Sequence, residues 1–568
     1  MITRHLTSML IRIENTFFEH LSTTLYSKGL KWMWRLICYA SSCFLVSCAS
    51  QVMPQGGDKD TNPPKITKTL PENFSTGFKS KKIVITFDEY IQLKDLNSQL
   101  IVSPPLSRTV ETKIRQKTLE IETSDTLQPN TTYTLNFGNS IVDNNESNAL
   151  ENFQYVFSTG DVIDSLKISG KVENAWDKKT EKGILVMLYK MQDDSLPLKK
   201  RPDYFSKTND KGEFTISNIS PGKYKMFALK ETNADYLYTA SDESVAFQDT
   251  PVDAGSQNML LRLFSEKPKL RVQKGYSEEP GKAIVIFNQP ATDVQCRFLS
   301  DSLKCDVAFI EYSTKRDTII FWYKNLNMDS LVLLFSNKKT LHDTVSIRLF
   351  TGEGKTFSRK KNTVSISPNF KNGEAFDLNK NIILQLNHPV TSFDFSKISL
   401  TEDSIPLTDV AISFLDTLKK TVSIRHQWKE KSTGRLFIPP GTFTDLFGYT
   451  NDSLITFLRV RQLTDYGTLT LKMKIGSRDI QYIVLLIDER ESAYRSSVIR
   501  GDTTITYDFL DPKVYRLKMI EDLNQNKEWD TGDYFKKIQP ERVLYYPEPI
   551  TIRANWDVDV TWRTGVGN

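Results

Sequence analysis

Three stretches of the chain share one strand pattern, and this repeat limits the possible fold more than any other feature. The stretches are residues 82–90, 282–290 and 381–389. Apolar and polar residues alternate in each, which places every second side chain on one face, as in a half-buried β-strand. Each stretch also contains an Asp or Asn whose side chain can bind the backbone and close a turn. These residues are Asp88, Asn288 and Asn387.

A second pattern of strands and turns alternates with the first. Its first copy comprises residues 166–170, 184–189 and 214–225, and its second copy comprises residues 469–472, 483–488 and 505–516. Both kinds of unit consist of short strands over ~100 residues, and helical periodicity is scarce after residue 66. The expected fold class is therefore all-β, built from tandem small β-sandwiches.

The repeats divide the chain into modules. At 568 residues the chain is too long for one hydrophobic core, since single domains usually hold ~100–150 residues. We expect β-sandwiches at residues 66–160, 161–265, 266–360, 361–461 and 462–568, which we call modules 1 to 5. Ahead of them, residues 1–47 are expected to form a signal peptide. Residues 48–65 are expected to hold a lipidated cysteine and a flexible tether.

The N-terminus carries a targeting signal. Lys28, Lys31 and Arg35 precede an apolar run at residues 36–46, which is typical of a secretory signal and too short to span a bilayer. The run ends in Leu-Val-Ser before Cys48, which resembles the bacterial lipobox, where the cysteine is acylated. The pattern predicts a lipid anchor in the outer membrane, on its periplasmic or cell-surface face. The alternative is an ordinary signal peptide with an incidental cysteine.

Two of these patterns resemble known families. Residues 82–90, with their Phe-Asp pair, resemble the bacterial Ig-like domain of surface-layer proteins. Residues 169–172 and 210–224 resemble the carboxypeptidase-regulatory-like, or prealbumin-like, module. Module 5 departs from this pattern, because Lys513 stands where module 2 has Gly222. Together with the lipobox, the resemblance implies a Bacteroidota-type lipoprotein of Ig-like and prealbumin-like domains, a family with no established enzymatic activity.

One loop predicts a calcium site. Residues 522–533 place oxygen-bearing side chains at loop positions 1, 3, 5, 9 and 12, a spacing that turns alternate residues toward one hard cation. These residues are Asp522, Asn524, Asn526, Asp530 and Asp533. Lys527 stands at the sixth position, where such loops usually need Gly. The alternative is a loop whose Asx side chains bond their own backbone.

The cysteines beyond Cys48 are few. Cys296 and Cys305 lie on the two arms of an expected hairpin. A disulfide between them would suit an oxidising compartment, and two buried free thiols are the alternative.

Signatures of catalysis are missing from the sequence. It has no His-x-x-His, Cys-x-x-Cys or Gly-x-Ser-x-Gly motif. Asp88 and Glu89 are adjacent strand residues that point to opposite faces, so they cannot easily act on one bond. His388 ends its strand and is expected to be a solvated turn residue. Residues 352–356 are expected to be a linker rather than a phosphate-binding loop, because position 349 is Leu.

Aromatic residues in the loops of modules 2 and 5 offer a further hint of binding. They are Tyr236, Tyr238, Trp529, Tyr534, Tyr545 and Tyr546. Exposed rings on such loops could stack on sugars or grip a partner protein, whereas the alternative is core packing.

The expected function follows from these features. We expect a non-enzymatic, lipid-anchored envelope protein that acts as a multidomain spacer, adhesion or binding scaffold for an unidentified envelope protein or glycan. The alternative is an accessory component or cryptic enzyme of envelope glycan or peptide processing, since prealbumin-like modules often accompany catalytic domains. Nucleic acid is not an expected partner, because the formal net charge is only +5 and no basic stripe is present.

Overall fold

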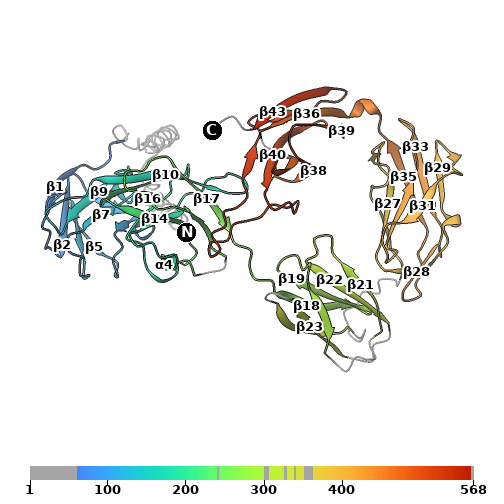
Figure 1. The fold of residues 1–568 in the computed structure, drawn as a ribbon, viewed down its shortest axis with the longest axis horizontal. Coiled ribbons are helices and arrows are strands. Elements are labelled where there is room, and N and C mark those ends of the chain that lie inside the picture. The colour runs from blue at the N-terminus through green and yellow to red at the C-terminus, as the bar shows by residue number, and fades with distance from the viewer. Residues whose placement is uncertain are drawn as a thin grey trace, which may run out of the picture.

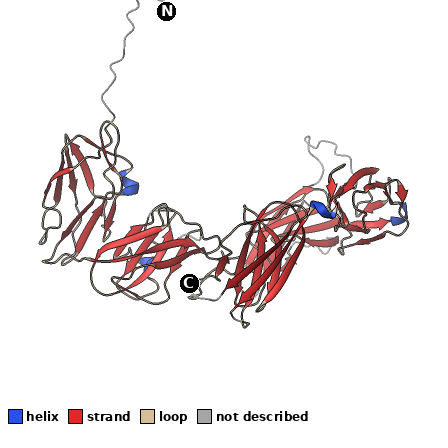
Figure 2. Cartoon of the chain, turned by 90° about the horizontal axis from the view of Figure 1, so that it is seen from above, coloured by secondary structure: helices blue, strands red, loops and turns tan. Residues whose placement is uncertain are grey.

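The computed structural model describes residues 60–564, except residues 234, 240–241, 300–305, 325–328, 338–340, 351–362 and 477. The expected signal peptide, Cys48 and most of the expected tether lie outside this range. Strands make up nearly all regular structure (Figure 2). The helices of the described part are α3 (Leu96–Gln99), α4 (Leu196–Lys199), η1 (Phe395–Lys397) and η2 (Leu463–Asp465). The all-β prediction is confirmed, and no helix of the described residues is long and apolar enough to cross a membrane.

The strands of modules 1, 3 and 4 follow in chain order. Module 1 has β1 (Ile66–Leu70), β2 (Lys82–Phe87), β3 (Ile91–Leu93), β4 (Ile101–Ser103), β5 (Glu111–Arg115), β6 (Thr118–Glu122), β7 (Thr132–Asn136), β8 (Ile141–Asp143) and β9 (Gln154–Ser158). Module 3 has β18 (Val272–Glu279), β19 (Lys282–Phe287), β20 (Gln295–Phe298), β21 (Asp306–Tyr312), β22 (Thr318–Lys324), β23 (Ser330–Ser336) and β24 (His342–Arg348). Module 4 has β25 (Ile366–Pro368), β26 (Ala375–Phe376), β27 (Ile382–Leu386), β28 (Val390–Phe393), β29 (Ser399–Glu402), β30 (Ile405–Pro406), β31 (Ala411–Phe414), β32 (Thr421–Arg425), β33 (Thr433–Ile438), β34 (Phe443–Asp445) and β35 (Leu454–Val460).

The three repeated strands occupy the same place in their modules. β2, β19 and β27 each lie second in a four-stranded sheet, in the orders β1-β2-β6-β5, β18-β19-β22-β21 and β25-β27-β32-β31. Their central apolar residues, Ile85, Val285 and Leu384, are fully buried against a second sheet. Period-two alternation therefore points the apolar side chains into a sandwich core, as predicted.

The Asp or Asn of each repeat does bind backbone, but not that of its own turn. Each side chain accepts a hydrogen bond from the backbone N–H at the start of the preceding strand. The bonds are Lys65 N to Asp88 (2.8 Å), Arg271 N to Asn288 (2.9 Å) and Ser365 N to Asn387 (2.9 Å). The three residues thus join neighbouring strands rather than close a turn. An amide does this as well as a carboxylate, which explains why Asp and Asn alternate at this position.

Modules 2 and 5 share a different topology. Module 2 has β10 (Leu166–Asn174), β11 (Leu185–Tyr189), β12 (Tyr204–Lys207), β13 (Glu213–Ile219), β14 (Lys223–Lys230), β15 (Ser244–Phe247), β16 (Val252–Asp253) and β17 (Met259–Ser265). Module 5 has β36 (Gly467–Ile475), β37 (Gln481–Ile487), β38 (Ala493–Ile499), β39 (Thr503–Leu510), β40 (Val514–Asp522), β41 (Val543–Tyr545), β42 (Ile550–Thr551) and β43 (Asp557–Thr564). In both modules the first strand pairs in parallel with the last, β10 with β17 and β36 with β43.

The modules are arranged as a ring rather than an extended string. Figure 1 shows module 5 (β36–β43, red) beside module 2, with modules 3 and 4 forming the rest of the loop and module 1 outside it. Every described sheet draws its strands from one module, so the ring is held by side chains and loops. Between modules 4 and 5, for example, Arg461 Nη1 contacts Asp377 (2.9 Å) and Asp511 (2.7 Å).

Candidate functional site

The loop predicted to bind calcium is the connection between β40 and β41, residues 523–542, which we call the β40–β41 loop. Asp522, at the end of β40, is fully buried. Its carboxylate accepts hydrogen bonds from the backbone N–H of Asn526 (3.1 Å) and Lys527 (2.9 Å) and from the Gln481 amide (2.6 Å). These donors hold the carboxylate in place without a cation.

Asp530 is the second carboxylate that accepts several hydrogen bonds in this loop. Its Oδ2 accepts hydrogen bonds from the side-chain amides of Asn524 (2.6 Å) and Asn526 (2.5 Å). Its Oδ1 lies 2.5 Å from Lys267 Nζ, in the segment between β17 and β18 that links the strands of modules 2 and 3. Burial alone would raise the pKa of Asp530, but the pair with Lys267 and the hydrogen bond from Asn524 outweigh it, so the pKa is lowered.

The structure therefore brings together four of the five residues predicted to bind calcium. The fifth, Asp533, turns away and pairs with Lys536 (2.5 Å). Asn524 and Asn526 also accept backbone N–H groups two residues on, at 3.0 and 2.8 Å, as in Asx-turns. Among the residues that the structure describes, no group of three or more His, Cys, Asp and Glu side chains is arranged to hold a metal. Calcium binding stays a prediction, and the alternative of self-bonded Asx turns accounts for the observed geometry.

The same loop docks on module 2, which the sequence did not reveal. Tyr534 is fully buried among rings of module 2, with centroid distances of 4.9 Å to Phe227, 5.3 Å to Phe247 and 6.3 Å to Tyr238. Its hydroxyl donates to the Asp194 carbonyl (2.8 Å). We call the part of module 2 formed by these four residues the tyrosine socket.

Polar contacts surround the tyrosine socket. The Tyr534 N–H donates to the Glu266 carboxylate (2.5 Å), which also accepts the Tyr238 hydroxyl (2.6 Å). Lys537 pairs with Asp194 (2.7 Å), and Lys225 of module 2 pairs with the same carboxylate. The Gln539 amide donates to Asp249 (2.9 Å) and to the Phe247 carbonyl (3.1 Å).

The loop aromatics are not fully exposed, so the alternative of core packing accounts for most of their contacts. Tyr534 and Tyr238 are buried, and the others, Tyr236, Trp529, Tyr545 and Tyr546, are partly buried. Trp529 packs on Trp176 of module 2 with ring centroids 5.1 Å apart. These rings mainly fill module cores and the contact between modules 2 and 5.

A second polar centre joins modules 3 and 4. His388 was expected to be solvated but is only 9% exposed, because module 3 covers it. Its Nδ1 lies 2.7 Å from Asp445 of module 4, and its Nε2 lies 3.7 Å from Glu279 of module 3. Trp322 packs edge-on against the His388 ring at 5.6 Å. The strand pattern predicts that His388 lies at a strand end, but no pattern in the sequence indicates that module 3 packs against it.

The contact around His388 should weaken as the pH rises. Burial lowers the pKa of His388, but the bonds to Asp445 and Glu279 outweigh it, so the pKa lies above its usual 6.5. A group whose pKa is raised by folding stabilises the folded state at pH values below its unfolded-state pKa. This contribution is lost as the pH rises through the folded-state pKa. We expect the melting temperature of modules 3 and 4 to fall between pH 6 and 8.5 by roughly 2–4 °C, from about 1 kcal/mol.

Calorimetry of the full chain at several pH values measures this fall. The His388→Gln variant is the control, because an uncharged amide should flatten the pH dependence of the same transition. An unchanged slope in that variant would assign the pH dependence to other groups.

The predicted cysteine pair is only half described. Cys296, on β20, is partly buried, and burial raises the pKa of its thiol to about 12. Cys305 lies outside the described residues, as do residues 352–356, expected to be a linker. The disulfide therefore stays a prediction.

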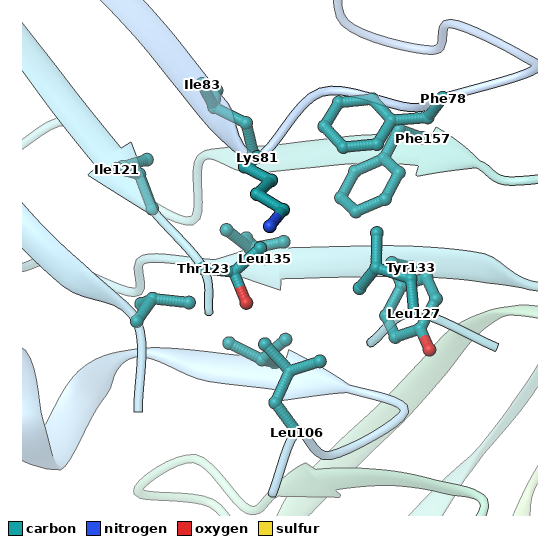
Figure 3. A pocket seen from close by; sticks show the side chains of 12 residues that line it. Phe78, Lys81, Ile83, Leu106, Ile121, Thr123, Leu127, Tyr133, Leu135 and Phe157 are labelled. Carbon is teal, nitrogen blue, oxygen red and sulfur yellow. The ribbon is translucent and has the colours of Figure 1, made fainter. Parts of the chain in front are cut away.

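Two small cavities occur in and beside module 1. The first has a volume of about 10 Å³ and lies between the two sheets, among twelve side chains that include Phe78, Phe157, Lys81 and Thr123 (Figure 3). The second, about 20 Å³, lies between modules 1 and 2 beside Ser103. A cavity of this size holds about one water molecule. Neither cavity has room for a substrate.

Comparison with known proteins identifies one module. A family model described as a bacterial Ig-like domain matches residues 60–159, which cover module 1. No curated protein matches the chain.

Several solved structures match the chain at low sequence identity. The major pilin subunit BcpA of Bacillus cereus is 9% identical over 71% of this chain and 99% of its own, with a TM-score of 0.13. The S-layer protein SbsC is 12% identical over 81% of this chain and 65% of its own, with a TM-score of 0.14. A Bacteroides ovatus protein, SGBP-B of a mixed-linkage glucan utilization locus, is 8% identical over 67% and 95%, with a TM-score of 0.17.

Proposed function

We propose that this chain is a non-enzymatic scaffold of the bacterial cell envelope, anchored by a lipid on Cys48 in the outer membrane. Its sandwiches would hold a binding surface for an envelope protein or glycan at a set distance from the membrane. Three findings support the proposal: module 1 matches a bacterial Ig-like domain, the described chain is all-β, and the polar clusters near His388 and Tyr534 join modules.

The main support for this proposal is that buried ionisable residues lie at contacts between modules. In an enzyme, perturbed ionisable groups usually converge on an open cleft. Here Lys518 and His388 instead face a neighbouring module, where Lys518 lies over the Trp176 ring and His388 faces Glu279. Such contacts fix the relative positions of modules, which is what a spacer or scaffold needs.

Removal of the predicted acylation site should release the protein from membranes. We expect wild-type protein to sediment with the outer membrane and to incorporate labelled fatty acid. The Cys48→Ser variant should lose the label and move almost wholly to the soluble fraction, because stable anchoring needs more than one acyl chain or signal.

Cys296→Ser is the matched control and should stay in the membrane fraction with its label. Sedimentation of Cys48→Ser with the membrane at the wild-type level would rule out the lipid anchor. A screen of purified protein for glycosidase and peptidase activity tests the non-enzymatic part separately.

A further inference from the structure

We propose that the β40–β41 loop is a releasable latch, which closes modules 2 to 5 into a ring and opens to give an extended chain. In the closed ring Tyr534 is inserted into the tyrosine socket of module 2, and in the open chain it leaves the socket. This inference concerns conformation and holds whether or not Cys48 is lipidated.

The contact closes a long covalent path. Tyr534 and Asp194, whose carbonyl accepts its hydroxyl, are 340 residues apart in the chain. Modules 3 and 4 lie between them and touch each other at His388 and at the Lys420–Glu311 ion pair (2.8 Å). The ring therefore closes only if module 5 meets module 2, and no strand pairing among the described residues joins those two modules.

Hydrogen bonds within module 5 hold much of the loop in shape independently of its contacts with module 2. Within module 5, the Glu541 carboxylate accepts the N–H groups of Leu523 (2.8 Å) and Asp530 (3.0 Å). Asp522 and Asp530 tie the rest of the loop together, as described above. A loop ordered in advance loses little conformational entropy on docking, so its contacts can contribute to closure. Four of the residues that predict a calcium site thus also form the hydrogen bonds that hold the loop together.

The fit of the loop to module 2 is specific at two points. Tyr534 has no exposed surface, and Lys537 lies 4.2 Å from its ring centroid while the hydroxyl donates to Asp194. Next to it, Gly532 passes so close to Phe264 that an added Cβ would lie 2.6 Å from that ring.

Other contacts of the β40–β41 loop are exposed to solvent and can exchange with water. Lys267 and Asp530 form an ion pair in which the lysine is 58% exposed, and such pairs contribute little to stability. Phe535 and Ile538 of the same loop remain largely exposed. Contacts between domains of one chain resemble transient protein interfaces, so motion between them is the default expectation.

Hydrogen–deuterium exchange on the full chain tests the latch. In Tyr534→Ala, the open population should rise by at least about a hundredfold, because truncation of a buried aromatic costs several kcal/mol and each 1.4 kcal/mol is tenfold. Exchange in residues 531–541 should speed up accordingly, because the backbone N–H of residue 534 bonds to Glu266 only in the closed ring.

Phe535→Ala is the comparison variant, since this neighbouring ring lies 5.7 Å from the Tyr534 ring but is 61% exposed. Its removal should speed exchange far less than Tyr534→Ala does. Lys267→Glu is the second variant. It lies in the segment between β17 and β18, disturbs no core, and should speed exchange several-fold by placing a like charge beside Asp530.

Small-angle scattering then reports the overall shape. The double variant Tyr534→Ala/Trp176→Ala, which removes both aromatic contacts between modules 2 and 5, should have a larger radius of gyration and maximum dimension than wild type. The proposal is overturned if Tyr534→Ala and Lys267→Glu both exchange at the wild-type rate and the folded double variant has the wild-type radius of gyration.

Discussion

Replacement of Gly170 by Ala should selectively unfold module 2, lowering its stability by roughly 3 kcal/mol. Gly170 lies on β10 and pairs with Met259 on β17, in the parallel ladder that joins the first and last strands of the module. A Cβ added there would collide with the Met259 carbonyl oxygen and lie 2.8 Å from the carbonyl carbon. Backbone atoms cannot rotate away as a side chain does, so the ladder itself must separate.

Calorimetry of the full chain measures this effect. For a module of about 100 residues, 3 kcal/mol corresponds to a fall of roughly 10–20 °C in melting temperature. Limited proteolysis identifies the module, because new cleavage sites should appear first within residues 161–265. Lys171→Ala, at the exposed neighbouring position, is the control and should change stability by less than about 0.5 kcal/mol. A melting profile of Gly170→Ala equal to that of the control would contradict the close approach of β10 to β17.

The repeats could be predicted from sequence because their signal is local. Ile85, Val285 and Leu384 are buried because alternation along a strand fixes which face a side chain occupies, whatever the rest of the chain does. The all-β fold and the recurrence of one strand in modules 1, 3 and 4 follow from this period alone.

The contacts between modules could not be predicted in the same way. His388 and Tyr534 are polar or amphipathic residues at a strand end and in a loop, and such residues are usually solvated. What buries them is a surface that follows from the packing of whole modules. Glu279 is 109 residues from His388, and Asp194 is 340 residues from Tyr534. No local pattern records a partner at such a distance.

The β40–β41 loop shows why the spacing of a motif does not by itself decide the chemistry of a site. Alternating Asp and Asn residues direct oxygen atoms inward, and a cation or amide hydrogens can meet those atoms equally well. Spacing alone cannot distinguish the two. Here Asn524 and Asn526 turn their NH₂ groups toward Asp530, which satisfies the carboxylate from within the loop.

Removal of the buried charge at Lys518 should destabilise module 5 by about 2–4 kcal/mol. Lys518 lies on β40 and is fully buried, with its Nζ 2.9 Å from Glu491 and 3.3 Å from the ring centroid of Trp176 in module 2. Burial lowers its pKa, although Glu491 partly opposes this effect. In Lys518→Met the ammonium and its cation–π contact are lost, while Glu491 keeps the hydrogen bond from the Tyr545 hydroxyl (2.8 Å).

A double variant separates the ion pair from simple packing. Removal of one partner of a buried ion pair leaves the other charge buried without a partner, which costs free energy. Replacement of both partners by uncharged residues avoids this cost. Lys518→Met/Glu491→Gln should therefore recover part of the stability that Lys518→Met loses in urea unfolding. Lys474→Met is the control, because its ion pair with Asp502 is exposed and should be worth at most about 1 kcal/mol. If Lys518→Met is no more harmful than this control, the ammonium contributes nothing to the contact between modules 2 and 5, and the Trp176–Trp529 packing alone must hold this side of the ring.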